Sequence, residues 1–144
     1  MGLFDKIFKQ VPEEDMLTKQ EAFAGIALAM AGADGSIAQS EWDGIVSYIR
    51  RLRLYDNFSG PAFDKMFDKL LKNQGASALV AASVTGLPED LKLTAFACAV
   101  DIALADGVVE EEEKDIINQL AELLEIPEQT AISIIEVLII KNKA

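Results

Sequence analysis

The sequence predicts an all-α protein with one domain over residues 1–144, built from two similar halves. Three observations predict it: apolar residues recur at helical spacing along most of the chain, strand patterns are essentially missing, and one turn motif occurs twice, 72 residues apart. A chain of 144 residues fits one domain, and a hydrophobic content of 51% is enough for a core. We expect the halves to cover about 16–75 and 86–142, after an amphipathic helix over 1–11.

The N-terminal segment and the first long helix are predicted from their spacing and their capping residues. Apolar residues of 1–11 fall on one face of a helix, which either docks on the core or lies on a membrane surface. Thr18 and Glu21 form a capping box that opens a helix reaching about Ala33. This helix is rich in Ala and Gly, and small residues let neighbouring backbones approach closely. We therefore expect it to be central.

Two more helices are expected in the first half. The apolar spacing predicts a helix over about 39–53. Ser59 is a typical N-cap residue, and Pro61 suits the first turn of the helix that then runs through Asn73. We expect the apolar face of the second of these helices to include Leu71.

Four helices are predicted after residue 75. A short helix covers about 76–84, and Pro88 opens a long apolar helix that ends at Ala105. The last two helices cover 110–125 and 128–141, with Pro127 between them. Residues 132–140 are almost continuously apolar, which favours a buried helix over a strand here.

The internal repeat is the strongest signal in the sequence. Residues 27–45 align with 99–117, and eight of the nineteen positions are identical. In each copy a helix ends in Ala-Asp-Gly, and a glutamate follows seven residues after the aspartate. The acidic residues of the two turns are Asp34 and Glu41 in the first copy, and Asp106 and Glu113 in the second.

The repeated turn predicts a site for a divalent cation between the two halves. Its spacing matches only the second half of an EF-hand loop, because the earlier ligand positions hold apolar residues or Gly. Neither loop is therefore a complete calcium site. If the halves pack about a pseudo-two-fold axis, Asp34, Glu41, Asp106 and Glu113 would converge on one ion. We expect Ca²⁺ first, with Mg²⁺ or Mn²⁺ as alternatives, since all these ions bind oxygen ligands.

A purely local interpretation of the same residues stays open. Asp34 and Asp106 can cap the helices that follow them. Glu41 and Glu113 fall near the first turns of those helices, where the helix dipole favours negative charge. The two interpretations are compatible, because a residue that caps a helix can also bind a cation.

The charge of the chain is concentrated in its last third. The net charge is -11, and residues 101–136 hold eleven acids against one lysine. Such a surface argues against nucleic-acid binding and fits a cation or a basic partner surface. The alternative is an acidic face that only keeps the protein in solution.

The composition also limits catalysis and location. The chain has no histidine and one cysteine, Cys98, which excludes histidine-based nucleophiles, cysteine zinc clusters and internal disulfides. We expect no enzyme activity, and Cys98 as a core residue. No signal peptide or membrane-spanning run is visible, which predicts a cytoplasmic protein.

Three segments resemble the TerB family of bacterial tellurite-resistance proteins. They are Ala-Leu-Ala-Met-Ala-Gly-Ala-Asp-Gly-Ser-Ile-Ala-Gln-Ser-Glu (27–41), Ile-Ala-Leu-Ala-Asp-Gly-Val-Val-Glu-Glu-Glu-Glu-Lys (102–114) and the opening Met-Gly-Leu-Phe-Asp-Lys-Ile-Phe. The resemblance implies a compact bundle of seven or eight helices in two similar halves. It also implies a metal-linked stress system with membrane partners, a divalent-metal site on the acidic surface, and no known catalytic reaction.

Matched by position, the resemblance points to the same four carboxylates as the repeat. Asp34 and Glu41 match the first motif, Asp106 and Glu113 match the second, and 110–112 fall where the family is also acidic. The expected function is a non-enzymatic module that binds a divalent cation and presents an acidic face to partners, one of which is a membrane-associated protein of the same resistance system. The alternative is a metal-free interaction domain on a basic or membrane-bound partner. A peripheral position at the inner membrane is compatible with either.

Overall fold

The computed structural model describes residues 16–35, 37–73, 75–105 and 107–144. In these ranges the chain is helical and contains no strand, as predicted; the segment 1–11 lies outside them. The helices are α2 (Lys19–Ala31), α3 (Gln39–Ile49), α4 (Gly60–Leu70), α5 (Ala76–Gly86), α6 (Lys92–Leu104), α7 (Glu111–Leu123) and α8 (Glu128–Lys141), with the 3₁₀ turns η2 (Arg53–Tyr55) and η3 (Glu89–Leu91).

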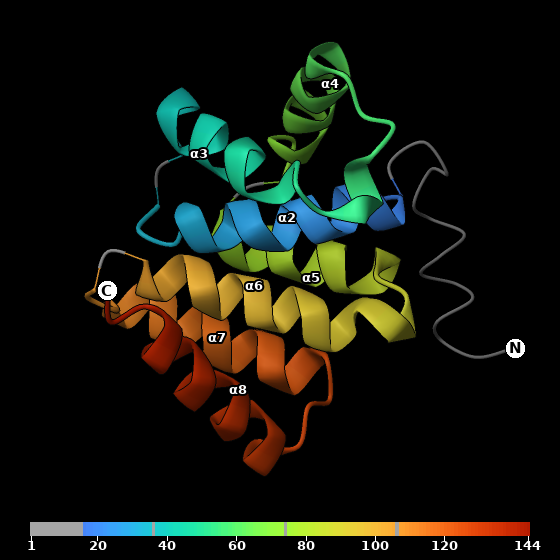
Figure 1. Cartoon of the computed structure of the whole chain (residues 1–144). Helices are drawn as coiled ribbons and strands as arrows, with labels where there is room; N and C mark the ends of the chain where they lie inside the picture. Colours follow the sequence, from blue (N-terminus) through green and yellow to red (C-terminus); the bar gives the residue numbers. More distant parts are fainter. Residues whose placement is uncertain (1–15, 36, 74, 106) are drawn as a thin grey trace, which may run out of the picture.

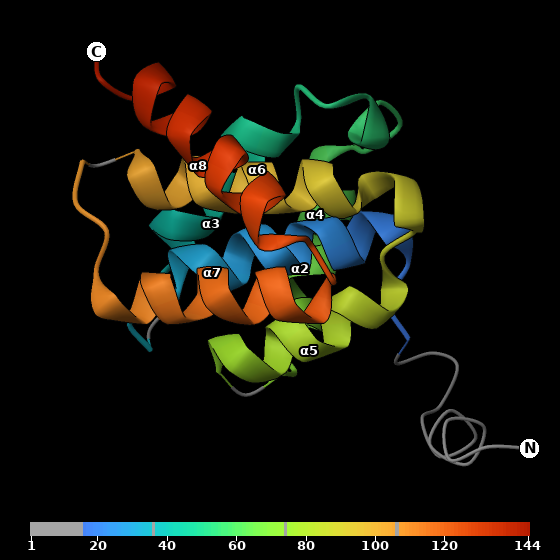
Figure 2. The ribbon, with the colours of Figure 1, turned by 90° about the horizontal axis from the view of Figure 1, so that it is seen from below.

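The helix boundaries follow the internal repeat. α3 begins at Gln39 and α7 begins at Glu111, which is 72 residues later. α2 packs against α3, α5 and α6, while α6 packs against α7 and α8. Figure 1 shows α2 and α6 in the middle of the bundle, with α3 and α4 on one side and α7 and α8 on the other. Figure 2 shows the same bundle from below, with α5 beside α7.

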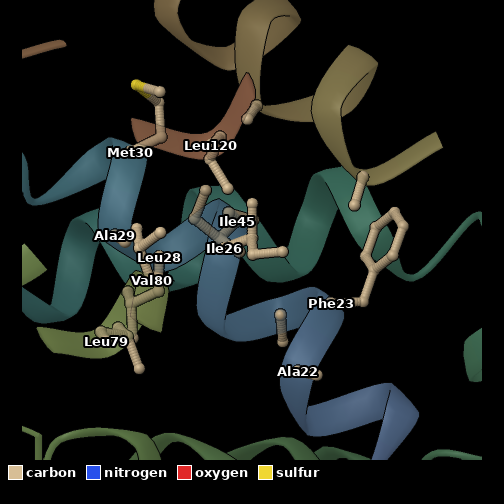
Figure 3. Close-up of a cluster of buried hydrophobic side chains, with 14 of the residues drawn as sticks. Ala22, Phe23, Ile26, Leu28, Ala29, Met30, Ile45, Leu79, Val80 and Leu120 are labelled. Atoms are coloured by element: carbon tan, nitrogen blue, oxygen red, sulfur yellow. The ribbon is translucent and has the colours of Figure 1, made fainter. Parts of the chain in front are cut away.

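α2 is the central helix, as its small residues predicted. Its residues 22–30 are all buried. Gly25 lets α5 approach closely, because a Cβ atom at this position would overlap Ser83 Oγ and lie 3.4 Å from Leu79 Cδ1, both on α5. The larger side chains of α2 meet Ile45 and Leu120 in the core (Figure 3).

The predicted caps are confirmed, and one of them also connects two helices. Thr18 Oγ1 accepts a hydrogen bond of 3.2 Å from the Glu21 backbone, and Glu21 Oε1 accepts one of 2.8 Å from the Thr18 backbone. Lys69 Nζ of α4 lies 2.9 Å from the same Glu21 oxygen. Burial alone would raise the pKa of Glu21, but its bonds to Thr18 and Lys69 outweigh burial and lower it. Ser59 Oγ accepts from the Ala62 backbone at 3.2 Å.

Two expectations of burial are wrong. Ala131 is the single buried residue of α8, whereas Val137 is 63% exposed and Ile140 is 67% exposed. α8 packs against α6 at the edge of the bundle, so much of its apolar surface stays uncovered by the described residues. Leu71, expected inside, is 44% exposed and is the C-cap residue that follows α4. Within the described ranges, no helix has the length and apolar composition needed to cross a membrane.

Candidate functional site

The two repeated turns depend on glycine. Gly35 has a φ of 102° and Gly107 has a φ of 83°, a region that residues with a Cβ atom rarely adopt. Each glycine follows the aspartate of its turn and redirects the chain toward the next helix. Asp106 itself lies outside the described residues, so its part in the predicted set of four stays a prediction.

Residues of both halves line one cavity beside these turns. The cavity has a volume of about 230 Å³. One side is formed by the end of α2 and the first turn, and the other by the start of α7. We call it the acidic cavity, because Asp34, Glu110, Glu112 and Glu113 all line it. Two of the four predicted residues, Asp34 and Glu113, therefore share a cavity.

Glu113 also has the local role that the alternative interpretation gave it. It lies in the first turn of α7, and its Oε1 accepts a 2.9 Å hydrogen bond from the backbone of Glu110, the N-cap residue. Asp34 does not have the helix-capping role that this interpretation gave it, because Ala38 occupies the N-cap position of α3. The prediction of Asp34 as the N-cap residue is thus wrong.

Glu41 lines a different cavity. This cavity has a volume of about 410 Å³ and lies between α3, α6 and the C-terminal end of α8; we call it the α3–α6 cavity. It shares Ala31 and Ile102 with the acidic cavity, so the two are neighbours. Glu41 Oε2 is buried and has no hydrogen-bond partner among the described residues. The structure therefore places Glu41 at the neighbouring cavity, and the convergence of all four carboxylates on one ion stays a prediction.

Asp101 is a buried carboxylate whose role the sequence did not reveal. It is 6% exposed and lines the α3–α6 cavity. Its Oδ2 accepts a 2.7 Å hydrogen bond from the Tyr48 hydroxyl, and its Oδ1 accepts from Asn142 Nδ2 at 2.8 Å and Lys141 Nζ at 3.1 Å. The available signal was an aspartate inside the apolar run 94–105.

These contacts set the ionisation of the cluster. Burial would raise the pKa of Asp101, but the hydrogen bonds from Asn142, Tyr48 and Lys141 together lower it below the ordinary aspartate value. Burial and the bond to Asp101 raise the pKa of Tyr48, so its hydroxyl stays a donor. Cys98, expected in the core, is half-buried and packs against the core. Its burial raises the pKa of its thiol. A raised pKa reduces the reactive thiolate.

Comparison with protein families identifies the fold. The family described as tellurite resistance protein TerB matches residues 20–135. The chain belongs to the TerB family. The match runs from α2 into α8 and includes both repeated turns. No curated protein and no solved structure gave a match.

The described part of the TerB chain contains no preformed cation site. Among the residues that the structure describes, no three acidic or cysteine side chains lie close enough together to hold a metal ion. The donors around the acidic cavity are nevertheless all carboxylates, the ligand type of Ca²⁺, Mg²⁺ and Mn²⁺. The donor chemistry fits a hard cation, and an ion would require these side chains to change rotamer around it.

Proposed function

We propose that this TerB domain is a non-enzymatic module that binds a divalent cation, Ca²⁺ in the first place, at the acidic cavity. The observation that carries the proposal is the joint lining of one cavity by Asp34 of the first half and by Glu110, Glu112 and Glu113 of the second. The proposal adds Asp106 from the sequence alone, because it matches Asp34 in the repeat. In this proposal the acidic start of α7 also faces a partner of a tellurite-resistance or metal-stress system.

The chemistry of the cavity favours a cation for two reasons. Carboxylates that line one cavity repel one another when they turn toward it, and a bound cation removes that repulsion. Ca²⁺ accepts 6–8 oxygen ligands at about 2.3–2.6 Å in flexible geometry, so carboxylates, backbone carbonyls and water can complete its coordination. Asp34, Glu110 and Glu112 are exposed, which leaves their side chains room to turn toward an ion.

Thermal unfolding with added cations tests this proposal. At a hundredfold excess over Kd, a ligand of the folded state adds about 2.7 kcal/mol to the free energy of unfolding. We expect Ca²⁺ to raise the Tm, and Asp34→Asn with Asp106→Asn to abolish the rise. A matched control is Asp43→Asn with Asp64→Asn, since these two aspartates line a separate cavity between α3 and α4.

The control variant should keep the full rise in Tm. The proposal fails if Ca²⁺, Mg²⁺ and Mn²⁺ all give neither heat in calorimetry nor a thermal shift at millimolar concentration. It also fails if the control variant loses the shift as completely as the double variant does.

A second function is favoured by the exposure of the acidic residues on α7. Glu111, Glu112 and Asp115 are all exposed, and Lys114 is the one base beside them. This acidic surface would dock on a basic protein surface without a metal ion. Such a complex weakens steeply as salt rises, because exposed charges are screened. This function would be excluded if a partner were retained equally well at high salt and by the variant Glu111→Gln with Glu112→Gln.

A further inference from the structure

The α3–α6 cavity is distinct from the acidic cavity in both shape and lining. Its walls are mainly apolar, with Ile45 on α3 and Ile102 on α6 opposite the end of α8. Its volume of about 410 Å³ falls in the range of small-molecule sites. Pockets of this kind hold a few polar groups that orient a ligand. Here those groups are Glu41 and the cluster around Asp101.

The two carboxylates of this cavity differ in their partners. Asp101 accepts three hydrogen bonds, and Lys141 compensates its charge. Glu41 Oε2 is buried, and the described residues offer it no hydrogen-bond donor. Leaving a carboxylate oxygen buried and unpaired is unfavourable, because it has lost its water without gaining a donor. Among the described residues, the ion pairs thus include Asp101 and Lys141 but give the Glu41 carboxylate of this cavity no basic partner.

The apolar lining indicates what kind of cation would match that charge. A divalent metal ion needs several oxygen ligands, whereas the described lining of this cavity has two carboxylates, and one of them, Asp101, is already paired with Lys141. Ile45, Ile102 and Ala105 offer hydrocarbon surface instead. An organic cation uses both features, since its charged group pairs with the carboxylate and its alkyl stem buries apolar surface.

We propose that the α3–α6 cavity binds a small aliphatic amine or guanidine. The ammonium or guanidinium group pairs with the Glu41 carboxylate, which turns toward the cavity so that its buried Oε2 gains a donor, and the alkyl stem packs between Ile45 and Ile102. This site is independent of the proposed metal site, which depends on Asp34 and Glu113. Glu41 would then bind an organic cation, whereas Glu113, at the same position of the repeat, would bind the metal ion.

Gly44 allows the cavity to be closed without damage to the fold. It lies inside α3 and lines the cavity, and a Cβ atom built on it meets no other atom within 4 Å. Gly44→Leu therefore places a side chain in or beside the open space. A glycine inside a helix is about 1 kcal/mol less favourable than a good helix former, so this variant should be at least as stable as the wild type.

Calorimetry on the full chain tests the proposal with n-butylammonium and n-butylguanidinium as probes and n-butanol as the neutral analogue. We expect both cations to bind and n-butanol to give no measurable heat. Glu41→Gln should weaken the cations about tenfold or more, because it removes a charge-assisted hydrogen bond. Gly44→Leu should abolish binding, and the control Asp43→Asn, one residue before Gly44, should change Kd less than twofold.

Several outcomes would overturn the proposal. One is the absence of heat from both cations at millimolar concentration. Others are equal binding of n-butanol, or full binding by Gly44→Leu. Binding of a lysine-containing peptide without any binding of n-butylammonium would assign the cavity to a protein partner instead. The absence of any cation effect in the wild type would overturn the metal proposal without affecting this site, so the two proposals fail separately.

Discussion

The hydroxyl group of Tyr48 donates a 2.7 Å hydrogen bond to Asp101 Oδ2 and so joins α3 of the first half to α6 of the second. Lys141 and Asn142, at the end of α8, bind the other oxygen of the same carboxylate. One buried group thus connects three helices that are far apart in the sequence. Because each oxygen of Asp101 has a donor, the cost of burying the charge is offset.

Asp101→Asn should destabilise the protein in a pH-dependent way. The folded-state pKa of Asp101 is lowered, so its ionised form stabilises the fold at neutral pH. This contribution is complete above the unfolded-state pKa of about 3.9 and is lost as the pH falls through the lower folded-state pKa. We expect the variant to lose about 1–3 kcal/mol at pH 7, measured by urea unfolding.

The difference between wild type and Asp101→Asn should then shrink as the pH is lowered below about 4. The exposed residue Asp56 provides a control, and Asp56→Asn should stay within about 0.5 kcal/mol of the wild type at pH 7. A difference for Asp101→Asn that is constant from neutral to acidic pH would contradict the assigned role of its charge.

Tyr48→Phe should cost about 1–3 kcal/mol, because it removes one donor and leaves Asp101 Oδ2 buried without a partner. A double-mutant cycle with Asp101→Asn measures the coupling directly. The two changes should be less than additive, by 0.5 kcal/mol or more, since they disrupt the same bond. Strict additivity would show that the hydroxyl and the carboxylate do not interact in solution.

Gly25→Ala should destabilise the packing of α2 on α5. The added methyl group would overlap Ser83 Oγ, and overpacking of this kind costs about 1–3 kcal/mol. Ser83→Ala alone should be neutral or slightly stabilising, because its buried hydroxyl has no hydrogen-bond partner in the described part of the chain. Thermal unfolding should show partial recovery in the double variant, and no recovery would mean that the overlap with Ser83 is not the cause.

The helices and caps were predictable because they depend on residues close together in the chain. The capping box of Thr18 and Glu21 spans three residues and needs no knowledge of the fold. To predict that Asp34 lies near the start of α7, local patterns were not enough. That prediction also used the internal repeat and the assumption of two-fold packing. The TerB match then confirmed the resemblance that the same residues had suggested.

The rest depends on contacts that local patterns do not encode. Glu41 and Glu113 occupy the same position in the repeat, yet they line different cavities. Their surroundings differ, since Ala38 is the N-cap residue of α3 whereas Glu110 is the N-cap residue of α7. The partners of Asp101 come from α3 and α8, which the spacing of α6 cannot reveal. The apolar pattern of α8 likewise does not tell how much of its surface is covered.

The bond between Tyr48 and Asp101 also breaks the symmetry of the repeat. The residue 72 positions after Tyr48 is Leu120, and the residue 72 positions before Asp101 is Ala29. If one first half packed against another first half, the tyrosine hydroxyl would meet an alanine. If one second half packed against another second half, the aspartate carboxylate would be buried beside a leucine. Both pairings leave a polar group without its partner. Each half is thus specific for the other, which disfavours exchange of like halves between two chains.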